Sequence, residues 1–298
     1  MTLLVDSHAH LDDPRFADDL PQVLERAWEA GVGRILTIVC LGEEPTRTLD
    51  QAYALLERDA RLYAGLGVHP HDARYWTEET EVVLEEATAD SRFVAVGEIG
   101  LDFHYDFSPR SQQVEVFRCQ LAWAEERRMP VIVHSREAEA ETAAILREEV
   151  RVQGGRAGSL RGVVHCFSGS SEFACESLSL GFSLGFGGML TFRKAESLRE
   201  TAVEVPLESI MLETDSPYLA PEPLRGRRNE PAYVRYVAAK LAEIRGLPME
   251  RVVQETTAGF ERLFRTQSSD GRESRQATQE WSALRAGVGR IRQDGIRR

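Results

Sequence analysis

The feature that most constrains the fold is a repeated alternation of short apolar segments with longer amphipathic segments. The apolar segments are typical of buried strands, and the amphipathic segments repeat with the period of a helix. The sequence predicts strands at residues 3–7, 34–40, 62–68, 93–104, 130–133, 160–164, 182–186 and 210–214. It predicts helices at residues 18–30, 46–59, 77–90, 109–128, 137–150, 170–180, 194–205, 230–245 and 249–264.

Strands that are apolar along most of their length are typical of parallel sheets, which helices cover on both faces. Eight such strands, each followed by a helix, predict an α/β fold with a single (β/α)8 TIM barrel. An open doubly wound sheet is the competing architecture, and the count of eight favours the barrel. A chain of 298 residues has room for two domains, but barrels of this length form one. Residues 1–266 are therefore expected to form one barrel domain with an extra C-terminal helix.

Residues 267–298 depart from this pattern. They are rich in Ser, Gln, Gly and Arg, with seven Arg against four acidic residues. Such a composition favours a polar, basic and flexible tail. A basic arm that contacts nucleic acid is the alternative interpretation.

Composition limits the cellular setting and the partners. No apolar run approaches the roughly 20 residues of a membrane-spanning helix, and the N-terminus lacks the pattern of a signal peptide. The cysteines form no C-x-x-C pair, so we expect reduced thiols in a cytoplasmic protein. The net charge of -12 argues against a broad nucleic-acid-binding surface, although it permits a local basic patch.

All the histidines lie at or just past the ends of predicted strands. The carboxyl ends of parallel barrel strands converge on one rim, which is where barrel enzymes place their active sites. The histidines are His8, His10, His69, His71, His104, His134 and His165. Their positions therefore predict a functional site at this rim.

Six of the rim side chains are candidate metal ligands: His8, His10, Glu98, His134, His165 and Asp215. The H-x-H pair of His8 and His10 lies on one face of a strand, so both imidazoles can bind one ion. Four imidazoles and two carboxylates exceed what one ion with an open water position needs. They suit two divalent ions, such as Mg, Mn, Zn or Fe, bridged by a carboxylate.

Strand periodicity suggests how the carboxylates are presented. Alternation places Val94, Val96 and Glu98 on one face, with Glu98 at the carboxyl end of the strand. Gly97 and Gly100 flank Glu98 and allow backbone or ligand to come close.

The second carboxylate, Asp215, is the candidate catalytic base, because a carboxylate that faces activated water can take its proton. Glu213, on the same predicted strand, is expected either to orient ligands or to form a buried structural pair.

Two residues are candidate substrate contacts. His69 follows the third predicted strand, and Arg136 follows His134 on the fifth. Imidazole and guanidinium groups both donate hydrogen bonds to phosphate, and Arg does so with two parallel bonds. Further cations occur in rim loops at Arg193, Lys194, Arg225, Arg227 and Arg228. Each of these residues also has an ordinary structural interpretation.

Several blocks together resemble the signature blocks of the TatD family of metal-dependent hydrolases. They are His8-Ala9-His10-Leu11-Asp12, Gly67-Val68-His69-Pro70, Gly97-Glu98-Ile99-Gly100-Leu101-Asp102, His134-Ser135-Arg136, His165-Cys166-Phe167-Ser168-Gly169, Glu213-Thr214-Asp215-Ser216-Pro217 and Arg228-Asn229-Glu230-Pro231. They occur in the family's order, over roughly residues 3–265.

The resemblance implies an amidohydrolase-like barrel that holds two divalent metal ions. It implies one ion held by His8, His10, Glu98 and Asp215, and a second held by Glu98, His134 and His165. The implied activity is a metal-dependent deoxyribonuclease with 3′→5′ exonuclease action. We expect DNA as the substrate, single-stranded or at its 3′ ends, and a protein that is a monomer or weak oligomer.

One departure concerns the last helix. Family members usually carry a Thr-Thr-x-Asn block there, whereas this chain has Thr256, Thr257, Ala258 and Gly259. We therefore expect the docking of that helix to differ.

Two other functions remain open from the sequence. A metallohydrolase of small amides, esters or acyl-tRNA can use the same barrel, often with a metal-bridging lysine at a strand end. Here neither Lys194 nor Lys240 ends a strand, which favours the nuclease. A non-catalytic metal-binding protein is the third interpretation, and the complete set of six ligands speaks against it.

Overall fold

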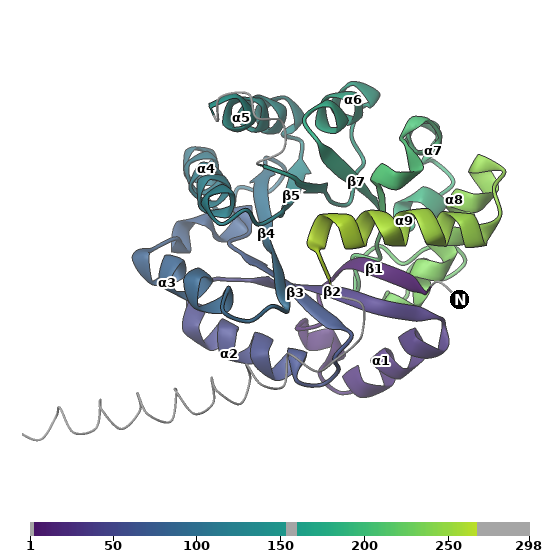
Figure 1. The fold of residues 1–298 in the computed structure, drawn as a ribbon, viewed down its shortest axis with the longest axis horizontal. Coiled ribbons are helices and arrows are strands. Elements are labelled where there is room, and N and C mark those ends of the chain that lie inside the picture. Colours follow the sequence, from purple (N-terminus) through teal and green to yellow (C-terminus); the bar gives the residue numbers. More distant parts are fainter. Residues whose placement is uncertain (1–2, 153–159, 267–298) are drawn as a thin grey trace, which may run out of the picture.

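The computed structural model describes residues 3–152 and 160–266, and it confirms the predicted (β/α)8 barrel. Eight parallel strands pair in chain order within one sheet, and the helices surround it (Figure 1). The strands are β1 (Leu4–Ala9), β2 (Val32–Cys40), β3 (Leu62–Gly67), β4 (Phe93–Asp102), β5 (Val131–Arg136), β6 (Gly162–Val164), β7 (Phe182–Phe186) and β8 (Ile210–Leu212). The tail beyond residue 266 and the glycine-rich stretch 153–159 lie outside the described residues.

The α-helices follow the predicted order, with ends that differ by a few residues. They are α1 (Leu20–Glu29), α2 (Pro45–Leu56), α3 (Glu78–Ala87), α4 (Arg110–Glu126), α5 (Glu139–Val152), α6 (Ser171–Ser179), α7 (Glu196–Glu204), α8 (Val234–Arg245) and α9 (Met249–Phe264). Ser108, just before Pro109, has the residue type and position that predict a cap for α4, but this prediction is wrong, because Ser108 makes no capping bond. Its hydroxyl instead donates to the carbonyl of His71, 2.7 Å away, and so ties two rim loops together.

The barrel closes where β1 meets the segment after β8. Ala9 and Ser216 form a parallel bridge, and the amide of His10 donates to the carbonyl of Ser216 at 2.7 Å. The amide of Asp215 donates to the carbonyl of His8 at 2.9 Å. Closure therefore depends on the same short segments that carry three of the candidate ligands.

Helix α9 covers the amino-terminal end of the barrel. Its Phe260, Leu263 and Phe264 join the apolar cluster inside the barrel, which also contains Val5 and Met211. Figure 1 shows α9 crossing in front of the strands. With this end covered, the carboxyl ends of the strands are left to form the site.

Gly259, which stands where the family's Thr-Thr-x-Asn block has Asn, has a structural role. A Cβ atom at this position would lie 2.7 Å from the carbonyl oxygen of Glu208, closer than real Cβ atoms approach. The Thr257 hydroxyl also donates to the carbonyl of Leu3 at 3.0 Å. Glycine therefore lets α9 pack directly against the backbone that precedes β8.

Strand β4 does not follow simple alternation, so the prediction that Val94, Val96 and Glu98 share one face is wrong. Val94 belongs to the cluster inside the barrel, whereas Val96 packs in the outer layer beneath the helices. Between Val96 and Ile99 the register against β5 shifts by one residue. This extra residue changes the phase of the strand, and Glu98 points into the barrel mouth as a result.

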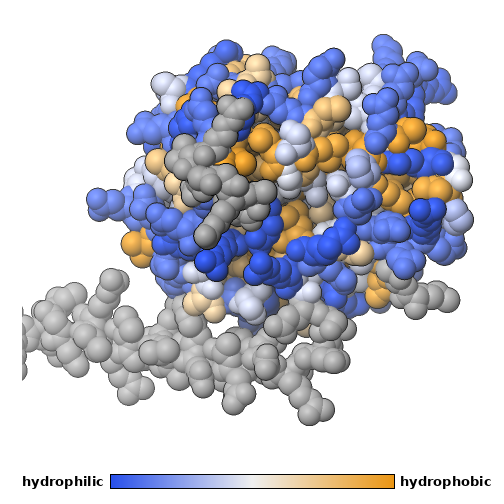
Figure 2. Space-filling model, turned by 45° about the horizontal axis from the view of Figure 1, so that its top comes forward, coloured by the Kyte–Doolittle hydropathy of each residue, from blue (hydrophilic) through white to orange (hydrophobic). Residues whose placement is uncertain are grey.

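The outer surface carries mostly polar side chains. Figure 2 shows hydrophilic residues over most of one face, with hydrophobic residues exposed in smaller areas between them. No helix among residues 3–152 and 160–266 is long and apolar enough to cross a membrane. All four cysteines are free thiols.

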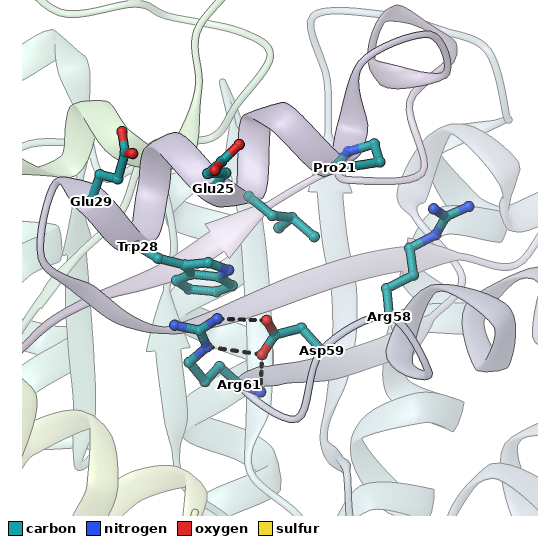
Figure 3. A pocket seen from close by; sticks show the side chains of 8 residues that line it. Pro21, Glu25, Trp28, Glu29, Arg58, Asp59 and Arg61 are labelled. Atoms are coloured by element: carbon teal, nitrogen blue, oxygen red, sulfur yellow. Dashed lines mark hydrogen bonds and ion pairs between the residues drawn. The ribbon is translucent and has the colours of Figure 1, made fainter.

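A surface pocket lies beside α1 and the loop that precedes β3 (Figure 3). The guanidinium of Arg61 lies 3.8 Å from the centre of the Trp28 ring and forms an ion pair with Asp59 at 2.6 Å. None of the candidate ligands or substrate contacts lines this pocket. Its main cation is already paired, so the pocket carries no functional assignment.

Candidate metal centre

The structure brings the six candidate ligands together at the carboxyl ends of the strands. Glu98 lies within β4, as predicted. His8 and His134 also lie within their strands, because β1 and β5 extend further than predicted. His10, His165 and Asp215 lie just past β1, β6 and β8.

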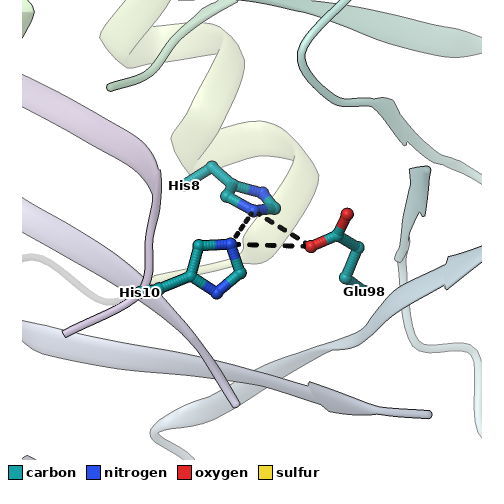
Figure 4. Close-up of side chains that lie close together, drawn as sticks. All are labelled: His8, His10 and Glu98. Carbon is teal, nitrogen blue, oxygen red and sulfur yellow. Dashed lines mark hydrogen bonds and ion pairs between the residues drawn. The ribbon is translucent and has the colours of Figure 1, made fainter. Parts of the chain in front are cut away.

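One group of ligand atoms gathers around one oxygen of Glu98. Oε2 of Glu98 lies 3.3 Å from Nε2 of His8 and 3.7 Å from Nε2 of His10. Oδ1 of Asp215 lies 3.4 Å from the His10 nitrogen and 3.9 Å from the His8 nitrogen. Figure 4 shows both imidazoles directed at the Glu98 carboxylate. His8, His10 and Glu98 thus form a group that could hold one ion, and Asp215 lies against both imidazoles.

A second group of nitrogens faces the other oxygen of Glu98. Oε1 of Glu98 lies 2.7 Å from Nδ1 of His134 and 2.6 Å from Nε2 of His165. Nε2 of His69 lies 3.4 Å from the same oxygen. The two oxygens of Glu98 thus serve two separate sets of nitrogens. Such a division is what a carboxylate bridging two ions requires.

The electrostatics of the site are those of a buried carboxylate among imidazoles. Burial opposes the charge on Glu98, but His165, His69 and His134 hold its pKa well below the usual range. Burial also works against the charged form of His10, yet its bond to Asp215 and the charge of Glu98 raise its pKa to about 9.

The pKa values of His8 and His134 shift in opposite directions. Burial and the neighbouring His165 lower the pKa of His8 to about 3. Burial also disfavours the charged form of His134, but bonds to Asp102 and Glu98 raise its pKa to about 9.

The donor set fits divalent cations. Among the described residues, the ion-pair partners of Glu98 and Asp215 are all histidines, with no Lys or Arg. Mixed imidazole and carboxylate ligation suits Zn, Mn and Mg without requiring thiolates. The local geometry also contains metal-competent groups, including His8 with His10 and Glu98, and His69 with Glu98 and His134.

Asp102, which the sequence left as either a loop residue or a residue behind the ligands, lies behind the second group and supports it. Its Oδ2 lies 3.1 Å from Nε2 of His134 and 3.0 Å from Nε2 of His71. Its Oδ1 accepts from the amides of His104 and Tyr105. Period 2 from Glu98 through position 100 to Asp102 was the available signal. His104 itself lies outside the centre.

Glu213 lies behind His165. Its Oε1 accepts a bond from the amide of Cys166 and lies 4.0 Å from Nδ1 of His165. Burial, reinforced by the charge of Asp215, raises the pKa of Glu213 well above its usual range. The carboxyl group thus lies beside the outward nitrogen of a candidate ligand, at a distance longer than a hydrogen bond.

The two predicted substrate contacts have different environments. His69 lies beside the second group of nitrogens, with its Nε2 3.4 Å from Oε1 of Glu98. Arg136 is exposed at the rim, with its guanidinium 4.8 Å from the centre of the Tyr105 ring. Arg228 is not available for phosphate in the way suggested from the sequence, because it pairs with Asp19 and Glu230.

The comparisons with known proteins agree with this geometry. A family described as TatD related DNase matches residues 5–265. The chain is 41% identical to the uncharacterized metal-dependent hydrolase YabD of Bacillus subtilis, over 88% of this chain and 99% of that protein.

It is 36% identical to a protein of Enterobacter lignolyticus named 3′-5′ ssDNA/RNA exonuclease TatD, over 88% of this chain and 98% of that protein. The crystal structure of YJJV, a TatD homolog from Escherichia coli, matches with a TM-score of 0.79 at 33% identity, over 89% of this chain and 98% of that one. The chain therefore belongs to the TatD family of metal-dependent hydrolases, and is a hydrolase acting on ester bonds.

Proposed function

We propose that this hydrolase is a deoxyribonuclease that shortens single-stranded DNA from its 3′ end. The proposal rests on one observation: the two oxygens of the Glu98 carboxylate face two different sets of histidine nitrogens. A two-ion site suits phosphodiester cleavage, because both the attacking and the leaving oxygen carry developing charge. The relative named as a single-stranded DNA and RNA exonuclease supports the same substrate class.

The ligands divide between two ions. His8, His10, Glu98 and Asp215 would hold one ion, and Glu98, His134 and His165 would hold the other. When bound, divalent ions supply Lewis acidity, which polarises phosphoryl oxygens and acidifies water.

Asp215 is the proposed proton acceptor. Its side chain is 13% exposed, compared with 3% for Glu98, so it faces the mouth where water and substrate enter. Its Oδ1 faces His8 and His10, and the thiol of Cys166 lies 3.8 Å from its Oδ2. A carboxylate held in this way can take a proton from the attacking water.

His69 and Arg136 are the proposed phosphate contacts. Nε2 of His69 lies 3.4 Å from Oε1 of Glu98, beside the second group of ligands, where it can donate to a phosphoryl oxygen. Arg136 forms no ion pair within the described part of the chain, so its guanidinium is available to an anion.

The test uses single-stranded DNA labelled at one end and assayed with Mg, Mn or Zn added to metal-stripped protein. A 3′→5′ exonuclease converts 5′-labelled strands into a ladder, and it releases the label of 3′-labelled strands as a mononucleotide. Asp215→Asn keeps the size of the side chain, and we expect it to lower kcat by about 10²–10⁴-fold.

The alternative is a metallohydrolase of small amides, esters or acyl-tRNA. It gains support if metal-loaded protein leaves every DNA and RNA substrate intact but cleaves ester or amide substrates. In that outcome the nuclease proposal is wrong, while the assignment of the metal ligands is unaffected.

A further inference from the structure

We infer that an aromatic shelf, formed by Tyr105 and Phe107 after β4, stacks against one nucleobase of the substrate. The inference rests on the proposed nuclease function and specifies how the substrate is held. The groups proposed above contact the phosphate and the attacking water. The shelf would add a binding site for a base.

The starting observation is where aromatic side chains are exposed. Among residues 3–152 and 160–266, the exposed large aromatic side chains are Tyr105, Phe107 and Tyr218, at 40%, 55% and 46%. Each of the three rings contacts a histidine at the barrel mouth. Exposed aromatic groups are costly in water, and their concentration at one site indicates a binding surface.

The shelf lies next to the second group of metal ligands. The rings of Tyr105 and Phe107 stack nearly parallel, with centres 5.3 Å apart and 10° between their planes. Both meet the ring of His71 edge-on, at 5.7 and 4.9 Å. His71 bonds to Asp102, which in turn bonds to His134. A base on the shelf would therefore be adjacent to a phosphate at the centre.

Hydrogen bonds that involve the backbone of Tyr105 and Phe107 hold the shelf in place. Arg74 donates to the carbonyl of Phe107 at 2.6 Å, and the amide of Tyr105 donates to Asp102 at 2.9 Å. Ser108 joins this loop to His71. The exposed rings are thus fixed in position before a ligand arrives, which lowers the entropy cost of binding.

The positive charge of Arg136 lies beside the shelf, so one site can hold both the base and the phosphate of a nucleotide. The guanidinium of Arg136 lies 4.8 Å from the centre of the Tyr105 ring, so a cation and two aromatic faces share one site. Base stacking on aromatic side chains and backbone contact by Arg are the usual means of binding single strands. A duplex keeps its bases stacked on each other, so the shelf favours unpaired ends.

Tyr218, on the other side of the mouth, is unsuited to the same task. The guanidinium of Arg15 lies 4.2 Å from the centre of its ring and covers one face. Its hydroxyl donates to Asp13 at 3.2 Å, and Asp13 also pairs with Arg15. The Tyr218 ring is therefore engaged by Arg15 and Asp13. Phe107, in contrast, stacks on Tyr105 on one side, is 55% exposed and has no cation over its ring among the described residues.

The test compares wild type, the double variant Tyr105→Ala with Phe107→Ala, and Tyr105→Phe. Each is assayed on single-stranded oligonucleotides that carry normal nucleotides or base-free sugars at the last two positions. Loss of stacking should raise KM on the normal substrate by about 5–150-fold and leave kcat nearly unchanged. Tyr105→Phe keeps the ring and should behave as wild type. Metal content should be the same in all three.

The base-free substrate provides the decisive control. Wild type and the double variant should have equal KM on it, because neither has a base to stack. Val203→Ala, which truncates an exposed apolar side chain on α7, should change nothing on either substrate. Equal KM of the double variant and wild type on normal DNA would overturn the inference, as would an equal rise on both substrates.

A binding measurement separates this inference from the proposed function. Fluorescence anisotropy with a labelled oligonucleotide, in EDTA, reports the affinity without hydrolysis. If wild type cleaves no oligonucleotide but binds one about 5–150-fold more tightly than the double variant, the nuclease proposal fails and the shelf stands. If wild type cleaves DNA but the variant binds equally well, only the shelf is wrong.

Discussion

Oδ2 of Asp102 lies 3.1 Å from Nε2 of His134, while Nδ1 of the same imidazole lies 2.7 Å from Oε1 of Glu98. Asp102 is therefore placed to accept the proton of Nε2, so that Nδ1 can face a bound ion. Carboxylates behind metal-binding histidines fix the ring orientation and make the ligand nitrogen more basic. The second metal position that we propose would thus depend on a residue outside its ligand set.

The first prediction concerns this support. Asp102→Asn retains the side-chain size but loses the charge, and it should weaken metal binding at the His134 position by about 10–100-fold. The position formed by His8 and His10 should be little affected. Isothermal titration with Mn²⁺ measures both affinities, and a variant with two unchanged affinities would rule out the supporting role.

The second prediction concerns the glycine before Glu98. Gly97 has φ +158°, and a Cβ atom there would lie 2.6 Å from Cβ of Ile132. Overpacking costs about 1–3 kcal/mol and an unfavourable backbone about 1–3 kcal/mol, so Gly97→Ala should lower the free energy of unfolding by about 2–6 kcal/mol. Urea denaturation measures this change.

Gly42→Ala is the matched control, because no atom lies within 4 Å of its added Cβ. It should change stability by no more than about 0.5 kcal/mol. If Gly97→Ala is as stable as this control, the close approach of β4 and β5 does not require glycine.

The third prediction concerns metal removal. An ion at 100 times its dissociation constant adds about 2.7 kcal/mol to folding stability. For a chain of this size, each kcal/mol corresponds to about 2–4 °C, so chelation should lower Tm by about 5–10 °C per ion. Differential scanning fluorimetry with and without EDTA checks this. An unchanged Tm would mean that the centre binds no ion with useful affinity.

Much of the fold could be predicted because it depends on local patterns. The apolar segments ended by His8, His134 and His165 are strands buried on both faces, and their order alone predicts the barrel. The candidate ligands could be predicted for a related reason. Polar residues at the ends of such strands must converge on one rim, whatever the details of packing.

What could not be predicted depends on contacts between distant segments. The sequence predicts Val94 and Val96 on one face, but a register shift against β3, between Phe93 and Ala95, separates them. Ser108 has the residue type and position of a helix cap, yet it bonds to His71 from a neighbouring loop. The closeness of His69 to Glu98 likewise depends on how two strands are aligned, which no local pattern encodes.

The central claim is that Glu98 bridges two ions, and the metal content of two variants tests it most directly. Elemental analysis and Mn²⁺ titration should find two ions in wild type and one in His134→Ala. Glu98→Ala, which removes both oxygens, should lose high affinity at both positions together. If Glu98→Ala still binds two ions with near-native affinity, the bridging assignment is contradicted.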